Sequence, residues 1–173
     1  TGLLATKRGA NTIRLENNLG YEGALNAGIS EARLQGYRFV LTMDADGQHT
    51  LEHVRAVIEA SDAADIVVAT RRTLPRISEK LASWVSRILW NVSDPFSGLK
   101  LYRLDSLTLP FDRSRLVGAT WLVTAIKNEL RVASVPITVL NRRGKSRFGG
   151  LLKANYRICR AMIMLIFLHF WGV

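Results

Sequence analysis

The chain has 173 residues, a length that forms one ordinary domain with a buried core. Apolar residues make up 48% of it and charged residues 22%, and this composition excludes an intrinsically disordered chain. The formal net charge of +10 favours an anionic partner, such as a phosphorylated substrate, an acidic lipid or a nucleic acid. The single cysteine, Cys159, excludes an internal disulfide framework, and we expect it among apolar neighbours.

In chain order, the first half predicts helices alternating with strands. Residues 3–9 predict the end of a helix, residues 11–16 a short strand and residues 21–35 a second helix. An apolar run at 39–43 predicts a buried strand, and a stripe at 51–58 predicts a helix capped by the preceding threonine. Together with a further strand that follows, this order is typical of βαβ units, in which ligands bind at the carboxyl ends of the strands.

An acidic turn follows the predicted strand at 39–43. Asp44 and Asp46 lie on the same side of an extended chain, so their carboxylates repel each other unless a cation lies between them. Mg²⁺ or Mn²⁺, often shared with a substrate phosphate, would bind both, and Gln48 or His49 would complete the coordination. The alternative is a polar turn that only caps the next helix, but an acidic cluster in a strongly basic protein favours the metal.

Two arginines end the next predicted strand, at residues 65–70. Arg71 and Arg72 thereby fall at the same edge of the predicted sheet as Asp44 and Asp46. Carboxylates and a metal ion beside arginines are what a diphosphate site requires.

The second half predicts three further elements and a basic loop. Residues 77–92 predict an amphipathic helix, and we expect its apolar stripe to face the core; the alternative is contact with a membrane or a lipid tail. Residues 99–103 predict a strand, 121–130 a helix and 133–140 a strand. The loop at 141–150 is basic and contains three glycines, which suits either a solvated charge run or a phosphate-wrapping loop.

The last segment, residues 151–173, changes from basic to apolar. Three basic side chains precede an almost wholly apolar run at 161–171, which is shorter than the about 20 residues that cross a bilayer. This order predicts an interfacial helix or the start of a spanning helix, and a buried core helix is the alternative.

Five short motifs occur in a fixed order along residues 11–150. They are Asn18–Gly28, Asp44–His49, Asp65–Arg71, Asp94–Arg103 and Gly144–Arg147. Together they resemble the family 2 glycosyltransferases that charge a polyprenyl or dolichyl phosphate with a sugar, the dolichyl-phosphate mannose synthase type. The resemblance implies an α/β protein with a GT-A (Rossmann-like) domain at residues 1–150, a mainly parallel sheet flanked by helices. An apolar, membrane-associated helix at 151–173 would follow.

The resemblance further implies a metal-dependent, inverting sugar transfer. The donor would be a GDP- or UDP-linked sugar, the acceptor a polyprenyl phosphate lipid, and the location the cytoplasmic face of a membrane. By matching position, Asp44, Asp46 and Gln48 would hold the metal, Mg²⁺ or Mn²⁺, and the donor diphosphate. Arg71 would meet a phosphate.

Three further residues match positions of the family's site. Asp94 lies where the acceptor-side acid is found, and it would orient or deprotonate the acceptor. Ser146 and Arg147 would close over the diphosphate or the lipid phosphate.

Two departures from the family pattern stand out. The first-strand motif of the Pro-x-Tyr-Asn-Glu type and the aspartate that reads the base are not found, so we expect an amino-terminal part of the natural protein to precede Thr1. Asn141 stands where many relatives have an arginine, and Arg142 or Arg143 would substitute for it.

Three alternatives to this function remain at the level of sequence. The same fold would also suit a saccharide acceptor or a membrane-surface scaffold that is no longer active. A basic nucleic-acid-binding domain would explain the charge but not the acidic turn. We expect no nucleic-acid partner, because no recognised nucleic-acid motif occurs.

Overall fold

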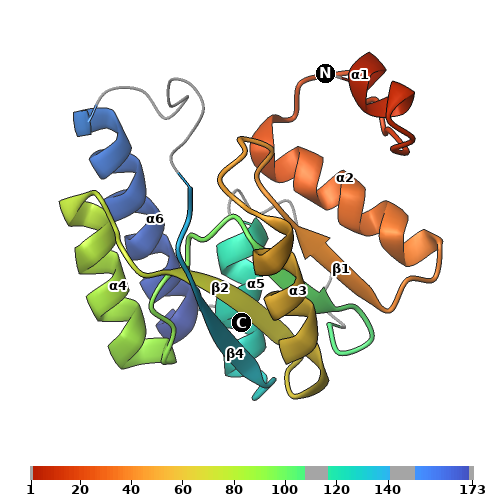
Figure 1. Ribbon diagram of the computed structural model, residues 1–173. Coiled ribbons are helices and arrows are strands. Elements are labelled where there is room, and N and C mark those ends of the chain that lie inside the picture. Colours follow the sequence, from red (N-terminus) through yellow and green to blue (C-terminus); the bar gives the residue numbers. More distant parts are fainter. Residues whose placement is uncertain (1, 108–116, 141–150, 172–173) are drawn as a thin grey trace.

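The structure, a computed structural model, describes residues 2–107, 117–140 and 151–171 (Figure 1). The helices are α1 (Gly2–Lys7), α2 (Gly20–Leu34), α3 (Leu51–Glu59), α4 (Ile77–Trp90), α5 (Val117–Lys127) and α6 (Leu151–Trp171), with a short 3-10 turn at Ala60–Asp62. The strands are β1 (Phe39–Thr42), β2 (Ile66–Arg71), β3 (Lys100–Arg103) and β4 (Val132–Ile137). Ser146 and Arg147 lie outside the described residues, as does the predicted phosphate-wrapping loop.

The four strands form one mixed sheet in the order β1-β3-β2-β4. β2 pairs with β4 in parallel, whereas β3 is antiparallel to both β1 and β2. The prediction of a mainly parallel sheet is therefore wrong for the pairs that involve β3. The physical reason is that the chain before β3 is fastened to the carboxyl end of β2, where Ala69 N donates to Leu99 O at 3.1 Å. A strand that starts at this edge must run against β2.

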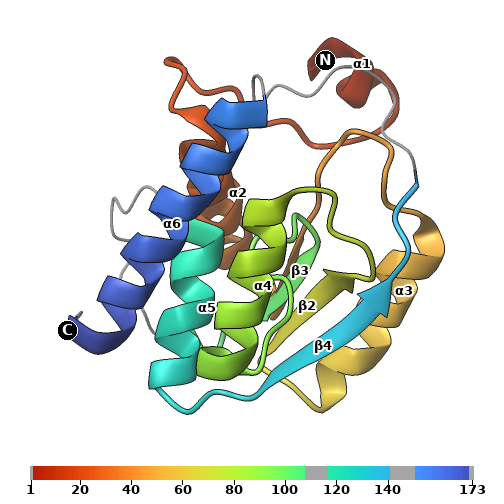
Figure 2. The same cartoon turned by 90° about the vertical axis from the view of Figure 1, so that its left-hand side faces the viewer.

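Helices cover both faces of the sheet, which explains why β2 is a continuous apolar run. Ile66 and Val68 point into one cluster with residues of α2, α4, α5 and α6, whereas Val67 and Ala69 point into a second cluster with α3. The views in Figures 1 and 2 agree, with α3 on one side of the sheet and α5 on the other. The carboxyl edge of the sheet is left for the candidate site.

The local predictions in the first half are confirmed with one exception. Thr50 caps α3, since its Oγ1 accepts from His53 N at 3.4 Å and its own N–H donates to His53 Nδ1 at 3.2 Å. Residues 11–16 form no strand, so that prediction is wrong. They are mostly exposed and, within the described residues, join no sheet. Alternation alone does not make a strand, because a strand needs a neighbour for its backbone hydrogen bonds.

Part of the apolar stripe of α4 faces solvent, whereas Val85 and Leu89 of the same stripe pack against the core. Four large side chains on it are 55–81% exposed: Ile77, Leu81, Trp84 and Ile88. The buried side of the helix carries small or polar residues and one tryptophan: Ser78, Glu79, Ala82, Ser86 and Trp90. The prediction of a core-facing stripe is therefore wrong at these four positions, because α4 packs closely through its small and polar side chains.

Helix α6 lies beside α4 and runs in the same direction (Figures 1 and 2). Ser78 Oγ donates to Asn155 Oδ1 at 2.6 Å near the starts of the helices, and the rings of Trp90 and His169 lie 6.1 Å apart near their ends. One stripe of α6 is buried: Ala154, Ile158, Met162 and Leu165. The core-helix alternative is thus correct for one side of α6.

The other side of α6 adds five apolar side chains that are 57–86% exposed: Leu152, Tyr156, Ile163, Phe167 and Phe170. We call these five residues, with Ile77, Leu81, Trp84 and Ile88 of α4, the apolar face. Cys159 is also exposed, contrary to the expectation that it lies among apolar neighbours. Within the described residues, no helix combines the length and apolar character needed to cross a bilayer.

Asp65 fastens the amino-terminal end of β2, at the edge of the sheet opposite the candidate site. Its carboxylate accepts hydrogen bonds from Arg131 Nε at 3.2 Å and from Ser106 Oγ at 2.9 Å, and it lies 3.4 Å from Arg103 Nε. The hydrogen bond from Arg131 is the main cause that lowers the pKa of Asp65 below its ordinary value, against the opposing effect of burial.

Asp65→Asn should therefore remove an acid-dependent part of the stability. A carboxyl group whose pKa is lower in the folded state stabilises the protein above its unfolded pKa, about 4, and this stabilisation is lost as the pH falls through the folded value. Urea unfolding at several pH values should show a destabilisation that is full at pH 7 and shrinks below about pH 4. The exposed Asp62→Asn is the control, and a difference from wild type that does not vary with pH would contradict the assignment.

Candidate functional site

The acidic turn, residues 43–49, continues β1 at the carboxyl edge of the sheet. Asp44 and Asp46 are both half-buried. Gly47 has a φ of +77°, a left-handed conformation that glycine adopts without steric cost, and Gln48 N donates to Asp46 Oδ1 at 3.1 Å. The turn is thus closed by its own backbone and presents two carboxylates.

Gln48 joins this turn to the segment after β4. Its Nε2 donates to Leu140 O at 3.1 Å, and Leu140 N donates in return to Gln48 O at 3.1 Å. Because the amide nitrogen is used in this way, the amide oxygen is the side-chain atom of Gln48 that can bind a cation.

The carboxylate of Asp44 lies directly against the backbone of Gly98. A Cβ atom at position 98 would come within 2.6 Å of Asp44 Cγ, so only glycine leaves room for the carboxylate there. Asp44 forms no hydrogen bond or ion pair with any other residue that the structure describes. A half-buried carboxylate in this state is suited to a cation.

The possible protein ligands fit a metal ion that is shared with a phosphate group better than a metal centre formed by the protein alone. In the described ranges, no three His, Cys, Asp or Glu side chains come together to hold a metal. Mg²⁺ and Mn²⁺ sites that share their ion with phosphate groups, however, use only one or two protein carboxylates, and Asp44 and Asp46 meet this requirement. Burial lowers the pKa of His49, although both carboxylates oppose the shift, so its ring is neutral at pH 7 and able to ligate.

Arg71, the last residue of β2, is held by Asp94. Its Nε donates to Asp94 Oδ2 at 2.7 Å and its Nη2 to Asp94 Oδ1 at 3.1 Å, while the backbone N–H of Arg71 also reaches Oδ2 at 3.3 Å. Burial disfavours the charged guanidinium, but the carboxylates of Asp94 and Glu79 outweigh this and raise the pKa of Arg71. Asp94 is only 3% exposed. The acceptor-side role of Asp94 stays a prediction, and both of its oxygens are used to fix Arg71.

Glu79, in the first turn of α4, extends this ion pair into a chain of four charges. Its Oε1 accepts from Arg71 Nη1 at 3.4 Å and from Arg76 Nη1 at 3.1 Å. Sequence reasoning missed this role. The available signal was a glutamate three residues after the position that precedes the helix, where it accepts from the Arg76 backbone N–H at 3.1 Å.

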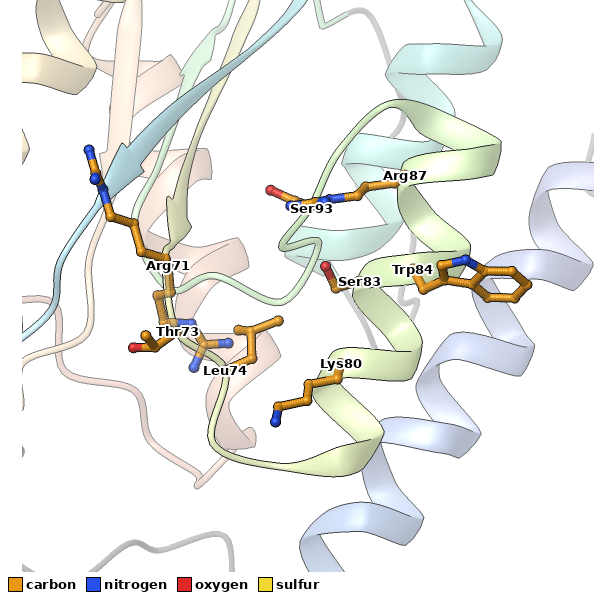
Figure 3. A pocket seen from close by; sticks show the side chains of 9 residues that line it. Arg71, Thr73, Leu74, Lys80, Ser83, Trp84, Arg87 and Ser93 are labelled. Carbon is orange, nitrogen blue, oxygen red and sulfur yellow. The ribbon is translucent and has the colours of Figure 1, made fainter.

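A pocket of about 440 Å³ opens between the carboxyl end of β2 and one flank of α4 (Figure 3). We call it the cationic pocket; it is lined by Arg71, Arg72, Thr73, Leu74, Lys80, Ser83, Trp84, Arg87 and Ser93. The sequence predicted the two arginines at the strand end, but not the contribution of Lys80 and Arg87. The spacing of Lys80 and Arg87 along the helix did not indicate which side of α4 faces the site.

The predicted residues Asp44, Asp46, Arg71 and Asp94 lie at one edge of the sheet. Asp44 and Asp46 follow β1, Arg71 ends β2, and the segment 94–98 between these strand ends contacts both: Asp94 holds Arg71, and Gly98 lies against Asp44. The acidic turn and Arg71 thus lie at the carboxyl edge of the sheet, where α/β proteins bind their ligands.

The chain belongs to glycosyl transferase family 2, whose family model matches residues 3–121. It is 31% identical over 149 residues to the undecaprenyl-phosphate mannosyltransferase of Micrococcus luteus, covering 76% of this chain and 61% of that protein. It is 26% identical over 171 residues to the UDP-N-acetylglucosamine–dolichyl-phosphate N-acetylglucosaminyltransferase of Methanococcus voltae, covering 88% of this chain and 68% of the relative. The chain thus spans about two thirds or less of the length of these relatives.

Solved structures support the fold. The glucosyl-3-phosphoglycerate synthase of Mycobacterium tuberculosis, crystallised with Mn²⁺, uridine diphosphate and phosphoglyceric acid, has a TM-score of 0.73 at 20% identity, over 96% of this chain and 62% of that chain. A crystal structure described as a mycobacterial protein has a TM-score of 0.74 at 18% identity, over 98% and 60%. The likeness confirms an α/β GT-A-like fold with a mixed sheet flanked by helices.

Asp94→Asn should destabilise the fold strongly, because it leaves the buried guanidinium of Arg71 with one ionic partner fewer. We expect a loss of about 3 kcal/mol, which lowers the Tm of a domain of this size by roughly 6–12 °C. Asp105→Asn is the matched control, since its pair with Arg38 is 3.8 Å long with both side chains more than two thirds exposed. It should change stability by less than about 0.5 kcal/mol. Equal effects of the two variants would refute the structural role of Asp94.

Gly98→Ala should displace the Asp44 carboxylate, because the added Cβ would clash with this side chain. We expect the affinity for Mn²⁺ with a nucleoside diphosphate to fall at least about tenfold, a loss of about 1.4 kcal/mol. Isothermal titration calorimetry measures it. Gly28→Ala is the control, because a Cβ there meets no atom within 4 Å. Unchanged affinity in Gly98→Ala would show that the position of Asp44 does not matter for binding.

Proposed function

We propose that this protein transfers a sugar from a GDP- or UDP-linked donor to a polyprenyl phosphate at the cytoplasmic face of a membrane. Membership of family 2 supports the class of reaction. The names of the relatives support the acceptor. A third one, the polyprenol monophosphomannose synthase of Mycolicibacterium smegmatis, is 32% identical over 152 residues, covering 76% of this chain and 57% of that protein.

On the donor side, Asp44, Asp46 and the amide oxygen of Gln48 would hold Mg²⁺ or Mn²⁺ with the donor diphosphate. A divalent cation bound there would stabilise the negative charge of the leaving nucleoside diphosphate. Arg71, fixed by Asp94, presents a guanidinium at the same edge of the sheet and would bind a phosphate oxygen.

The reaction would be a single displacement with inversion. An oxygen of the acceptor phosphate forms a bond to the anomeric carbon, while the bond from that carbon to the diphosphate oxygen breaks and its electron pair leaves with the nucleoside diphosphate. Because a lipid phosphate is already ionised near pH 7, no group has to remove a proton from it. This chemistry is compatible with an Asp94 that is committed to Arg71, and it relies on positioning and charge.

The apolar face is the observation that favours a lipid acceptor. Nine large apolar side chains lie exposed on two adjacent helices, at the flank of the site formed by Arg71 and Glu79. Both helices also carry exposed basic residues, namely Lys80 and Arg87 on α4 and Lys153, Arg157 and Arg160 on α6. An apolar surface with basic flanks is typical of a segment that lies on an anionic membrane. A water-soluble saccharide acceptor would leave this surface without a role.

Thermal unfolding with nucleotides tests the donor side. GDP or UDP should raise the Tm in the presence of Mn²⁺, since a ligand that binds only the folded state stabilises it. EDTA or Asp46→Asn should abolish the shift, whereas the exposed Asp105→Asn should retain it. The intact natural protein is the sample, and failure of every nucleotide to change its Tm would refute the proposed function.

A further inference from the structure

We propose that Lys100 is a positioning residue for the donor side of the site, where its side chain holds the Ser97–Gly98 peptide in place against Asp44. This inference rests on the proposed function and adds a buried residue on which metal and nucleotide binding depends, although that residue does not bind the ligand itself.

Lys100 occupies a position at which the core accommodates an apolar side chain. It is the first residue of β3 and is only 4% exposed. Its neighbours across the sheet are Thr42 of β1 and Val68 of β2, and Val68 belongs to the core cluster that α4 and α5 cover. A lysine is rarely buried to this extent, because removing its charge from water is costly. The side-chain nitrogen is therefore the feature of Lys100 that needs an explanation.

This nitrogen binds the turn that precedes the strand. Lys100 Nζ donates to Ser97 O at 2.6 Å, a short distance that is typical of a charged donor. The same turn is closed by Ser97 N, which donates to Asp94 O at 3.2 Å, and by Leu99 N, which donates to Ser97 Oγ at 3.3 Å. Asp94, Ser97 and Lys100 are each at most 4% exposed, so solvent does not readily replace a donor that is lost here.

The carbonyl group that Lys100 binds belongs to the peptide that leads into Gly98. The backbone of Gly98 lies against the carboxylate of Asp44, and on the far side of this glycine Thr42 Oγ1 donates to Gly98 O at 3.4 Å. The peptides before and after Gly98 are thus held from two strands. Because glycine has the widest choice of backbone conformations, its place depends on such contacts. Loss of the Lys100 donor should let the Ser97–Gly98 peptide rotate and shift the surface on which Asp44 rests.

The effect of Lys100 on a ligand would pass through the backbone. Its burial leaves Asp44 and Asp46 as the groups that would meet a metal ion, and Arg71 as the group that would meet a phosphate. A residue that only fills the core lowers the stability when it is changed, but it leaves the affinity of the folded protein unaltered. A positioning residue lowers the affinity as well, and this difference can be measured.

Binding of Mn²⁺ together with GDP or UDP to the intact natural protein, measured by isothermal titration calorimetry well below the Tm, tests this role. Lys100→Met keeps the length of the side chain and removes the donor, and it should weaken binding at least about tenfold. The EPR spectrum of the bound Mn²⁺, which reports the geometry of its ligands, should change as well. Lys100→Gln is a second variant, neutral and one atom shorter, which should fold and still weaken binding several-fold.

Two controls separate positioning from stability. In Lys127→Met the lost contact is of the same kind, since Lys127 Nζ donates to Leu168 O at 3.3 Å, but α5 ends near the start of β4, at the edge of the sheet opposite the site. Asp65→Asn, which should lower the stability at that same edge, matches the loss of stability. Both should bind Mn²⁺ and nucleotide as wild type does.

A double-mutant cycle tests the route through Gly98. If Lys100 acts by placing Gly98 against Asp44, Lys100→Met/Gly98→Ala should weaken binding no more than the stronger of the two single variants. Fold-changes that multiply would contradict this route, because they are expected of two independent effects.

The remaining outcomes each overturn a defined claim. Wild-type affinity in Lys100→Met or in Lys100→Gln would refute the positioning role and leave the proposed function standing, since wild type would still bind Mn²⁺ and nucleotide. A loss in Asp65→Asn as large as in Lys100→Met would assign the effect to general destabilisation and refute the positioning role. Failure of wild type to bind any nucleotide with Mn²⁺ would refute the proposed function and this inference with it.

Discussion

The ion pair between Arg71 and Asp94 is the interaction on which the arrangement of the site depends. It joins the end of β2 to the segment that leads into β3, and Glu79 extends it to α4. Because the same segment carries Gly98, whose missing side chain leaves room for Asp44, the pair indirectly fixes the acidic turn as well. A buried charge pair with two direct hydrogen bonds stabilises only when its geometry is kept, so the four segments are held in one arrangement.

The cations near this pair divide into two groups with different roles. Arg71 is largely buried and paired, so its charge is already committed to the structure. Arg72, Lys80 and Arg87 are exposed and have no acidic partner among the described residues, which leaves their charge for an anion. Beside them, α4 exposes four large apolar side chains to solvent: Ile77, Leu81, Trp84 and Ile88. Charge and exposed apolar surface on one helix are the combination that an amphiphile requires.

The sequence predicted what depends on neighbours along the chain and failed where distant segments decide. The N-cap at Thr50 is local and was confirmed. The direction of β3 and the packing of α4 depend on which segments meet in the fold. The amphipathic pattern favoured the apolar side of α4 as the buried one, which is wrong at four positions. In the site, Asp44, Asp46 and Arg71 were predicted because strand ends meet at one edge of a sheet. The contact of Gly98 with Asp44 joins segments that are far apart in the sequence, and the pairing of Glu79 with Arg71 depends on how α4 packs. Only the fold reveals these two contacts.

The central claim is that the acidic turn and the face of α4 serve one reaction, the glycosylation of a lipid phosphate. Its most direct test is the intact protein with Mn²⁺, a labelled nucleotide sugar and a prenyl phosphate, followed by extraction into organic solvent. We predict that labelled sugar enters the organic phase with wild type, and that it does not do so with Asp46→Asn or in the presence of EDTA. Label transferred only to a water-soluble acceptor, or organic-phase product that persists in Asp46→Asn, would contradict this account.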